Sequence, residues 1–360
     1  MERRHFFALC ASAGASATLA EGVWQQVQAA GTSELARVFP GSPITRDVIR
    51  SAESMIGVAF ADSEREMMVN VLESYLAWYL ALRTVELENH VSPAFRFSAI
   101  LPGRAYTGSQ RSTGAAATSR PVVTRPATAA ELAFFNVVQL AELMRTRQVT
   151  SVELTHMYLD RLRAYNDELK VVVNYTEDRA LKQAAAADRE IAAGRYRGPL
   201  HGIPYGVKDS LAVAGYPTTW GAVQFRDRVI NTTATVVQKL DAAGAVLLAK
   251  LSMGELGLSD RWFGGRTMSP WQPSEGALGS SAGSAAATAA GLVAFAIGEE
   301  TMGSIVMPST RNGVTGLRPT FGRVSRTGGF TLCWTLDKLG PMARCVEDCA
   351  VVLEAIAGRE

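Results

Sequence analysis

Two serine-rich turns are the parts of this chain whose residue types could do acyl chemistry. Ser280 and Ser281 lie in a Gly/Ser-rich turn, and Ser304 lies in a second turn, EETMGSI at 299–305, that is predicted to lead into a helix. A serine at a strand-to-helix turn exposes its hydroxyl, while neighbouring backbone N–H groups and the positive helix end suit a developing oxyanion. A loop that only connects packed elements is the alternative interpretation.

One lysine has a sequence environment that could make it a base. Lys208 follows the apolar run IPYGV at 203–207. A lysine near a strand end is usually a solvated surface charge, but this run predicts that the stem of Lys208 enters the core. Burial disfavours the charged ammonium, so the amine loses its proton more readily. A neutral amine in that position could act as a general base.

These motifs, taken together, resemble those of the amidase signature family. The stretch GPLHGIPYGVKDSL surrounds Lys208, the block LGSSAGS begins at Leu278, the turn with Ser304 follows, and GLRPT closes the set at 316–320. The resemblance covers residues 129–360. It implies hydrolysis or transfer of amides by a Ser–Ser–Lys triad.

The resemblance assigns a role to each matching position. Ser304 takes the place of the nucleophile, and Ser280, twenty-four positions earlier, takes the place of the bridging serine, which in the family follows a cis peptide bond. Lys208 takes the place of the base. Ser304 would attack the amide carbonyl and form an acyl-enzyme. The expected oxyanion hole consists of backbone N–H groups of Thr301, Met302, Gly303 and Ser304.

The chain departs from the family pattern outside the triad. Leu278 replaces the first glycine of the usual pair, and Ala282 interrupts the second pair. Met302 stands where the family has glycine, and Val306 where it often has arginine. Because the oxyanion hole is built from backbone groups, Met302 is expected to leave it in place while its side chain narrows the site.

A rival hydrolase motif is present at the same block. GSSAG at 279–283 matches the G-x-S-x-G nucleophile elbow, with Ser281 as the nucleophile. That machinery needs an acid and then a histidine downstream, whereas the four histidines, His5, His90, His156 and His201, all lie upstream. No Ser-x-x-Lys dyad occurs either. His201 is therefore interpreted as a structural residue near the lysine loop.

A second class of function is that of a subunit rather than a free-standing enzyme. Some members of the family serve as the amidase subunit of an amidotransferase and release ammonia from glutamine, and a non-catalytic binding subunit of the same fold is a further alternative. An export signal argues against the amidotransferase role, since tRNA charging takes place in the cytoplasm. Retention of the N-terminus in the mature protein would favour it.

Alternating helix and strand patterns predict an α/β layered domain over 129–360, with a mostly parallel or mixed sheet flanked by helices. The predicted helices are 129–147, 150–164, 180–193, 233–243, 285–290 and 346–356. The predicted strands are 171–175, a strand leading up to Lys208, 245–249 and 292–297. Cys345 and Cys349, four apart on the last helix, are expected to be small buried hydrophobes rather than a disulfide.

A helical region is predicted before this domain, over residues 31–105. Thr45 is expected to cap a helix through Ser54, and Ser63 with Glu66 has the form of a capping box. The helix after it carries an apolar stripe from Met67 to Leu80, expected to pack on the catalytic domain. Residues 106–128, rich in Gly, Ser, Thr, Ala and Pro, are predicted to be a linker.

Composition and the N-terminal sequence indicate which partners and which cellular location to expect. The 360 residues are 48% hydrophobic and carry a net charge of +2, so neither nucleic-acid nor membrane-surface binding is indicated, and a small-molecule amide is the expected partner. No metal or cofactor motif is present. Residues 1–30, with Arg3 and Arg4 before an apolar run, resemble a twin-arginine export signal, which predicts a periplasmic or secreted protein. A frayed helix is the alternative, and a retained N-terminus would mean a cytoplasmic protein.

The chain is also expected to be a fragment truncated at its C-terminal end. Members of the family usually continue well beyond the position that corresponds to Glu360, with elements that complete the sheet. A sheet cut there would expose an unpaired strand edge and an apolar face. The chain alone is therefore expected to be poorly soluble or weakly active.

Overall fold

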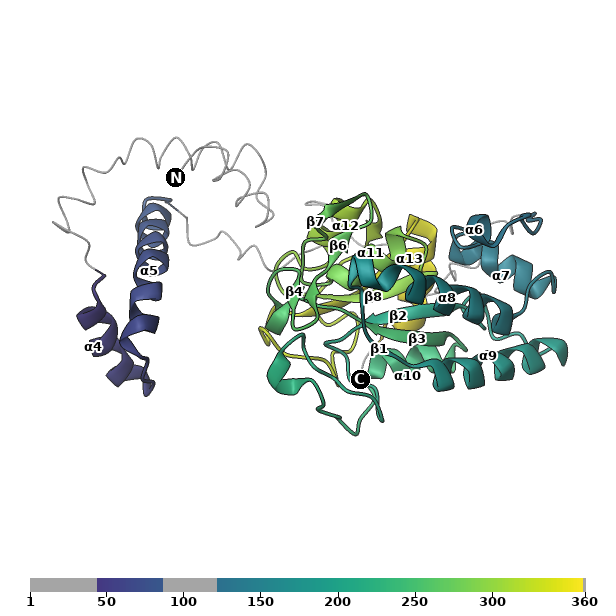
Figure 1. Cartoon of the computed structure of the whole chain (residues 1–360), viewed down its shortest axis with the longest axis horizontal. Coiled ribbons are helices and arrows are strands. Elements are labelled where there is room, and N and C mark those ends of the chain that lie inside the picture. Colours follow the sequence, from purple (N-terminus) through teal and green to yellow (C-terminus); the bar gives the residue numbers. More distant parts are fainter. Residues whose placement is uncertain (1–43, 87–121, 359–360) are drawn as a thin grey trace. The chain divides into compact units, whose positions relative to one another are not determined.

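The computed structural model describes residues 44–86 and 122–358, and the chain divides into two units, Met1–Tyr106 and Thr107–Glu360 (Figure 1). The predicted export signal at 1–30 and the predicted linker up to residue 121 lie outside the described residues. The predicted domain boundaries therefore stay predictions. Each unit is described below by itself.

The first unit contains a helical hairpin, α4 (Arg46–Ile56) and α5 (Asp62–Arg83). The predicted cap at Thr45 is confirmed, since its hydroxyl accepts a hydrogen bond of 3.3 Å from the amide of Val48. The predicted capping box at Ser63 is wrong. The N-cap of helix α5 is Ala61, two residues earlier, and the carboxylate of Glu64 accepts from the amide of Ala61 at 2.6 Å.

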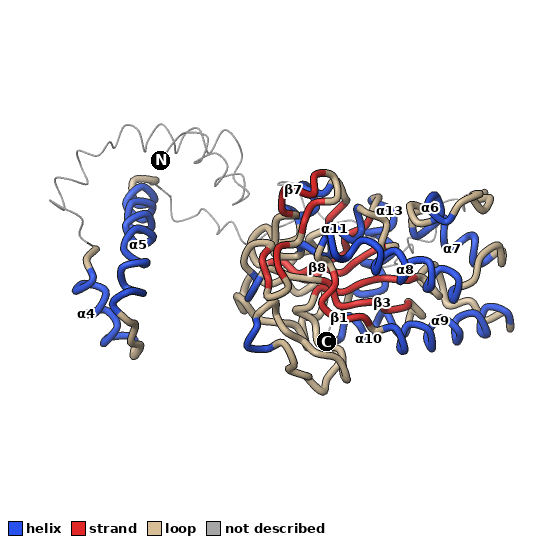
Figure 2. Tube along the Cα trace, viewed as in Figure 1, coloured by secondary structure: helices blue, strands red, loops and turns tan. Residues whose placement is uncertain are grey.

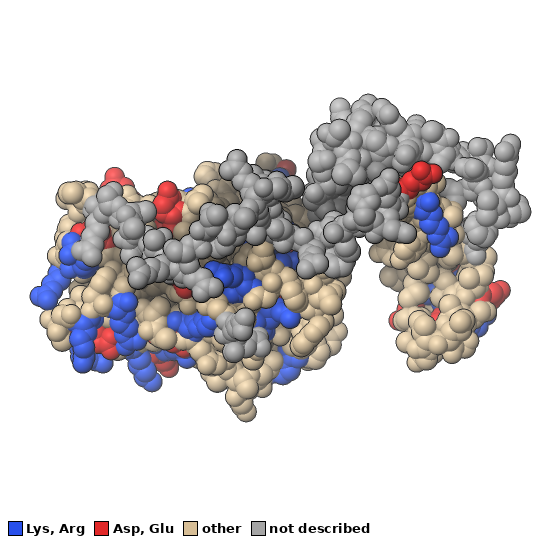
Figure 3. Space-filling view, turned by 180° about the vertical axis from the view of Figure 1, so that it is seen from behind, with Lys and Arg blue, Asp and Glu red and all other residues tan. Residues whose placement is uncertain are grey.

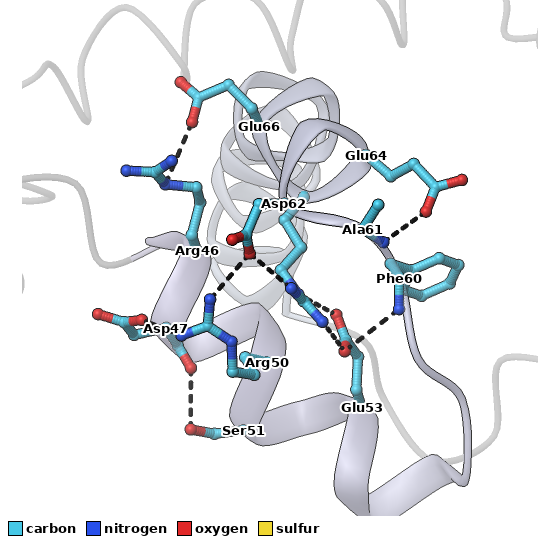
Figure 4. Close-up of polar contacts among 11 residues, drawn as sticks. Arg46, Asp47, Arg50, Ser51, Glu53, Phe60, Ala61, Asp62, Glu64 and Glu66 are labelled. Carbon is cyan, nitrogen blue, oxygen red and sulfur yellow. Dashed lines mark hydrogen bonds and ion pairs between the residues drawn. The ribbon is translucent and has the colours of Figure 1, made fainter.

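A cluster of charged side chains ties the two helices of the hairpin together (Figure 4). Arg65 donates to both carboxylate oxygens of Glu53, at 2.7 and 2.6 Å, and to Asp62 at 2.6 Å. Arg50 reaches the same Asp62 at 2.8 Å. A bidentate pair of this kind fixes orientation as well as distance. The apolar stripe that follows is exposed at Met67 and Tyr79, and its predicted packing on the catalytic domain stays a prediction.

The second unit is built on a six-stranded mixed sheet with the order β1-β3-β2-β8-β10-β9 (Figure 1). Strand β2 pairs in parallel with β3 and with β8, and the remaining pairs are antiparallel. Strands β2, β3 and β8 are buried along their whole length, as strands covered on both faces are. The α/β layered fold is thus confirmed. The strands are β1 (Val172–Tyr175), β2 (Pro204–Lys208), β3 (Val246–Leu251), β8 (Phe295–Glu300), β9 (Thr315–Gly316) and β10 (Lys338–Ala343).

Helices flank this sheet (Figure 2). Helix α9 packs on β3, α11 on β8 and β10, and α13 on β10. The α-helices are α6 (Ala129–Leu132), α7 (Val137–Arg145), α8 (Ser151–Leu169), α9 (Glu177–Ala192), α10 (Thr235–Ala242), α11 (Ala282–Ala289), α12 (Val306–Asn312) and α13 (Val346–Ile356). Short 3-10 turns lie at Val223–Phe225 and Glu255–Gly257, and two small hairpins are formed by β4 (Arg261–Trp262) with β5 (Gly265–Arg266) and β6 (Met268–Ser269) with β7 (Gln272–Gly276).

Several predicted elements of this unit have the wrong extent; helix α8, for example, continues to Leu169, past its predicted end at Ala164. The predicted helix 129–147 is split into α6 and α7, because Asn136 caps a new helix: its side chain accepts from the amide of Gln139 at 2.8 Å, and Gln139 accepts from the amide of Asn136 at 3.0 Å. The predicted strand 292–297 begins three residues later, as β8. Leu292, Val293 and Ala294 are buried but lie in the turn before it.

A buried ion pair braces the sheet beside the end of β2. Lys250 on β3 lies 2.8 Å from Asp209, and both side chains are fully buried. The other Asp209 oxygen accepts from the amide of Thr219 at 2.9 Å, and Lys250 donates to the hydroxyl of Thr218 at 2.6 Å. Such a pair persists only when its remaining hydrogen-bonding groups are satisfied. It anchors the 217–219 loop next to Lys208.

The second unit has charged side chains of both signs on its surface, and its cysteines, all within the described residues, form no disulfide. Figure 3 shows Lys and Arg side chains spread over its visible face, with Asp and Glu side chains among them. Cys333, Cys345 and Cys349 are free. The absence of a bridge between Cys345 and Cys349 was predicted, but only Cys349 is buried and Cys345 is partly exposed. Burial raises the pKa of Cys349 to about 12. Of the helices within 44–86 and 122–358, none has the length and apolar character needed to cross a bilayer.

Candidate active site

Lys208 is the last residue of β2, and its ammonium group lies inside the protein. The residue is 2% exposed. Its Nζ donates to the hydroxyl of Ser280 at 2.8 Å and to the main-chain carbonyl of Glu299 at 2.9 Å. The sequence-based expectation that the lysine stem enters the core is confirmed. Strand β8, which carries Glu299, runs alongside β2 (Figure 1).

The surroundings of Lys208 weaken its hold on a proton. Burial lowers the pKa of Lys208 to about 8, while the carboxylates of Glu299, Asp337 and Glu300 oppose that shift. No carboxylate within the described ranges lies close enough to Lys208 to form an ion pair. A lysine with a pKa near 8 is partly neutral at mildly alkaline pH and can accept a proton.

Ser280 is held against Lys208 by the turn before α11. The peptide bond between Gly279 and Ser280 is cis, as the family resemblance implied. A side chain at position 279 would overlap the carbonyl oxygen of Ser259, so the close approach of this second backbone requires glycine. Ser280 itself is 2% exposed. Its hydroxyl therefore faces Lys208 in a site closed to bulk water.

The turn that carries Ser304 is joined to the Ser280 turn by the backbone. The carbonyl of Ser304 accepts a hydrogen bond of 3.1 Å from the amide of Ser281. Gly303 has φ of 96°, in the left-handed region that favours glycine, and this conformation turns the chain from β8 toward α12. Ser304 is partly exposed, whereas Ser280 is not. Lys208 at the end of β2 and the two turns that carry Ser280 and Ser304 thus lie at one end of the sheet.

Backbone N–H groups are available beside Ser304. No described residue accepts a hydrogen bond from the amides of Met302, Gly303 or Ser304. The next two amides, of Ile305 and Val306, both donate to one carboxylate oxygen of Glu300, at 2.8 and 3.0 Å. The Met302 side chain is 69% exposed. The amides without an acceptor therefore lie in the turn. The amides at the start of the helix are already bound by Glu300.

Asp337 holds the far side of this turn. Its carboxylate accepts from the hydroxyl of Thr301 at 2.5 Å and from the amides of Leu332 and Cys333 at 3.0 and 2.9 Å. A cavity of about 260 Å³ lies next to it, lined by Arg326, Thr327, Gly328, Gly329, Phe330, Thr331, Trp334 and Asp337. Asp337, Glu299 and Glu300 were missed by sequence reasoning. A carboxylate pair directly after an apolar strand was the available signal for the last two.

His201 lies apart from these residues. It precedes β2, at the opposite end of the strand from Lys208, and is 1% exposed. Its Nδ1 accepts from the amide of Arg197 at 3.1 Å, and Glu190 lies 3.2 Å from its Nε2. Burial lowers the pKa of the His201 imidazole. These contacts match a structural role, although the histidine is not near the lysine turn.

Comparison with known proteins decides the family. The Amidase family profile matches residues 153–360, more than half of the chain. The chain belongs to the amidase family. The resemblance to amidase signature enzymes that the motifs predicted is thereby confirmed.

Individual amidases and related subunits match the same part of the chain. A glutamyl-tRNA(Gln) amidotransferase subunit of Moorella thermoacetica is 40% identical over 233 residues, which is 64% of this chain and 48% of that protein. The solved peptide amidase of Stenotrophomonas maltophilia superposes with a TM-score of 0.61 at 42% identity, over 62% of this chain and 48% of that one. The chain spans about half the length of the amidase relatives it matches.

The described part of the amidase chain has no cluster of side chains that could bind a metal ion. Within residues 44–86 and 122–358, no three His, Cys, Asp or Glu side chains are placed to hold one ion. The polar groups around Lys208 are instead a hydroxyl and a carbonyl.

Proposed function

We propose that this chain carries the catalytic machinery of an amidase that hydrolyses or transfers a carboxamide through Lys208, Ser280 and Ser304. The observation that carries the proposal is the hydrogen bond of 2.8 Å between Lys208 Nζ and Ser280 Oγ in a buried site. A buried lysine whose nearest partners are a serine hydroxyl and a carbonyl is suited to exchange a proton with that serine.

This contact supports the first of the proton movements in the proposed reaction. Neutral Lys208 takes the proton of the Ser280 hydroxyl, and Ser280 takes the proton of Ser304. The Ser304 oxygen attacks the amide carbon, and a tetrahedral oxyanion forms. The proton then returns through Ser280 to the leaving nitrogen, and the C–N bond breaks to give an acyl-enzyme. Water or another nucleophile, deprotonated along the same route, releases the acyl group.

Charge that develops on the carbonyl oxygen needs donors in place before the reaction. The amides of Met302, Gly303 and Ser304 support this role, since no described residue occupies them. Fixed backbone donors stabilise an oxyanion more strongly than mobile water does. The amide of Thr301 belongs to the same proposed set, and its side chain is fixed by Asp337.

Labelling with a fluorophosphonate tests the proposal without knowledge of the substrate. The reagent reacts with an activated serine and mimics the tetrahedral intermediate. Peptide mapping is expected to place the label on Ser304. A label on Ser281 instead would support the nucleophile-elbow alternative, and a folded chain without any label would point to a binding subunit.

The second candidate function is to serve as one subunit of an amidotransferase, favoured by the 40% identity to a glutamyl-tRNA(Gln) amidotransferase subunit. Such a chain would release ammonia from glutamine, and it would do so efficiently only with its partner subunits present. Turnover of glutamine compared with a panel of simple and peptide amides separates the two candidates. The acyl substrate would occupy space near Thr301 and Asp337, where the 260 Å³ cavity lies.

We also propose that residues 1–30 direct export through a twin-arginine signal. The proposal rests on the sequence alone, with Arg3 and Arg4 before the apolar run. Exported protein is expected to begin near Ala30, and replacing both arginines with lysine is expected to leave the precursor in the cytoplasm. Mass spectrometry of the mature protein provides the measurement. A mature mass that still includes Met1 would contradict export and favour the cytoplasmic alternative.

A further inference from the structure

Glu299 is a buried carboxyl group at the end of β8 that the proposed reaction does not use. We propose that Glu299 is a positioning residue for that reaction: its carboxylate, buried on the residue whose main-chain carbonyl binds Lys208, holds the proton on the lysine and so fixes the pH range in which the base works. This inference rests on the proposed function. It adds a control on the base that the triad motif does not contain.

The backbone fixes the position of Glu299 relative to Lys208. Strands β2 and β8 pair in parallel, with Val207 opposite Ile297, so their carboxyl ends lie side by side. The carbonyl of Glu299 accepts from Lys208 Nζ at 2.9 Å, and its amide donates to Ser281 Oγ at 3.1 Å. The residue that carries the carboxylate is therefore hydrogen-bonded directly to the proposed base.

The Glu299 side chain lies in a place where a charge acts strongly. Glu299 is 5% exposed, and its Oε1 has no hydrogen-bond partner among the described residues. That oxygen faces Gly329, where an added Cβ atom would lie 3.6 Å away. In a site with little water, a carboxylate and an ammonium interact over distances at which surface charges are screened.

The charged groups around Glu299 come from three directions. Lys208 faces it from β2, and Asp337 and Arg326 face it from the segment before β10. Glu300, the next residue, is committed to the amides at the start of α12. Burial raises the pKa of Glu299 to about 7, and Lys208 opposes that shift. Glu299 and Lys208 therefore titrate in neighbouring pH ranges, and each carries charge that stabilises the other's charged form.

The sign of the effect follows from these neighbours. The Glu299 carboxylate is the largest of the charges that raise the pKa of Lys208 against burial. When this carboxylate is removed, less charge opposes the effect of burial and the pKa of Lys208 falls further. Lys208 then loses its proton at lower pH. A variant with a neutral residue at 299 should therefore become active at lower pH than the wild type does.

The rate of fluorophosphonate labelling of Ser304, measured from pH 5 to 10 on the full chain, tests the inference. In Glu299→Gln the acid limb of the rate profile is expected to move to lower pH by about one unit. Glu255→Gln, which removes an exposed carboxylate outside the site, serves as the matched control and should superpose on the wild type. An acid limb of the Gln variant that stays in place or moves to higher pH overturns the inference.

A second neutral variant protects the test against a folding failure. Glu299→Met has similar length and adds no polar atom of its own to the buried site. It is expected to give the same displacement, and either folded variant with a wild-type limb rejects the inference. The two proposals fail differently. A wild-type chain that is never labelled on Ser304 rejects the proposed function, whereas labelling with an unmoved limb rejects only the role of Glu299.

Discussion

Ser304→Ala is expected to abolish amide turnover, with a loss of at least about a thousandfold. The Ser304 hydroxyl is the only group of the protein that forms a bond to the substrate carbon in the proposed reaction. The fold should be unaffected, since Ser304 is linked to the Ser280 turn through its carbonyl and not its side chain. Turnover of the amide that the panel identifies, with circular dichroism as the check on folding, is the measurement.

The neighbouring hydroxyl of Ser281 supplies the matched control for this variant. Ser281 Oγ donates to the carbonyl of Glu299 at 3.0 Å and accepts from its amide, so its role in the structure is to fix the backbone. Ser281→Ala is expected to cost stability but to retain measurable turnover and labelling. If Ser281→Ala is inactive while Ser304→Ala still turns over the amide, the nucleophile assignment is wrong and the elbow alternative is right.

Lys208→Met is expected to reduce turnover by about 10²–10⁴-fold, the usual contribution of a positioned general base. Methionine keeps the length and the apolar stem but cannot accept a proton. In the wild type, activity is expected to rise with pH through about 8, because burial lowers the pKa of Lys208 to that value and only the neutral amine can take a proton. The rising limb should be absent in Lys208→Met.

The serine between base and nucleophile gives a second test of the same mechanism. Ser280→Ala breaks the route from Ser304 to Lys208, so the double variant Lys208→Met/Ser280→Ala should lose little more than either single variant does. Losses that multiply would mean that the two residues act independently. A wild-type profile that is flat from pH 5 to 10, with chemistry rate-limiting, would argue against a lysine base.

Much of the site could be predicted because its parts are local in the sequence. An apolar strand that ends in Lys208 and a Gly/Ser turn before a small-residue helix are each readable from adjacent residues, and the structure places Lys208 and Ser280 in contact. Helix α13 was predicted with its observed bounds. The split between α6 and α7 was missed because a single asparagine, Asn136, decides it.

The remaining parts depend on contacts between distant segments, which a single sequence does not record. Asp337 meets Thr301 across 36 positions, and no local pattern near either residue predicts their bond. The N-cap of α5 is Ala61 instead of the predicted Ser63, and Asp62, the first residue of the helix, is bound by Arg50 of α4 across twelve positions. Glu299 and Glu300 look equivalent in the sequence, yet the main-chain carbonyl of Glu299 binds Lys208 and the carboxylate of Glu300 binds the amides at the start of α12.

The position of Glu300 bears on which ions can compete with the substrate. The amides of Ile305 and Val306, at the start of α12, would otherwise be open to a stable anion such as a buffer phosphate or a released carboxylate. Because Glu300, which also pairs with Arg318, already holds these amides, a carboxylate product would find only the turn amides beside them. The free turn amides would stabilise the charge that develops on the carbonyl oxygen during the reaction more than they stabilise the acid product. This difference favours release of the acid once it has formed. The same arrangement disfavours inhibition by anions in the surrounding medium.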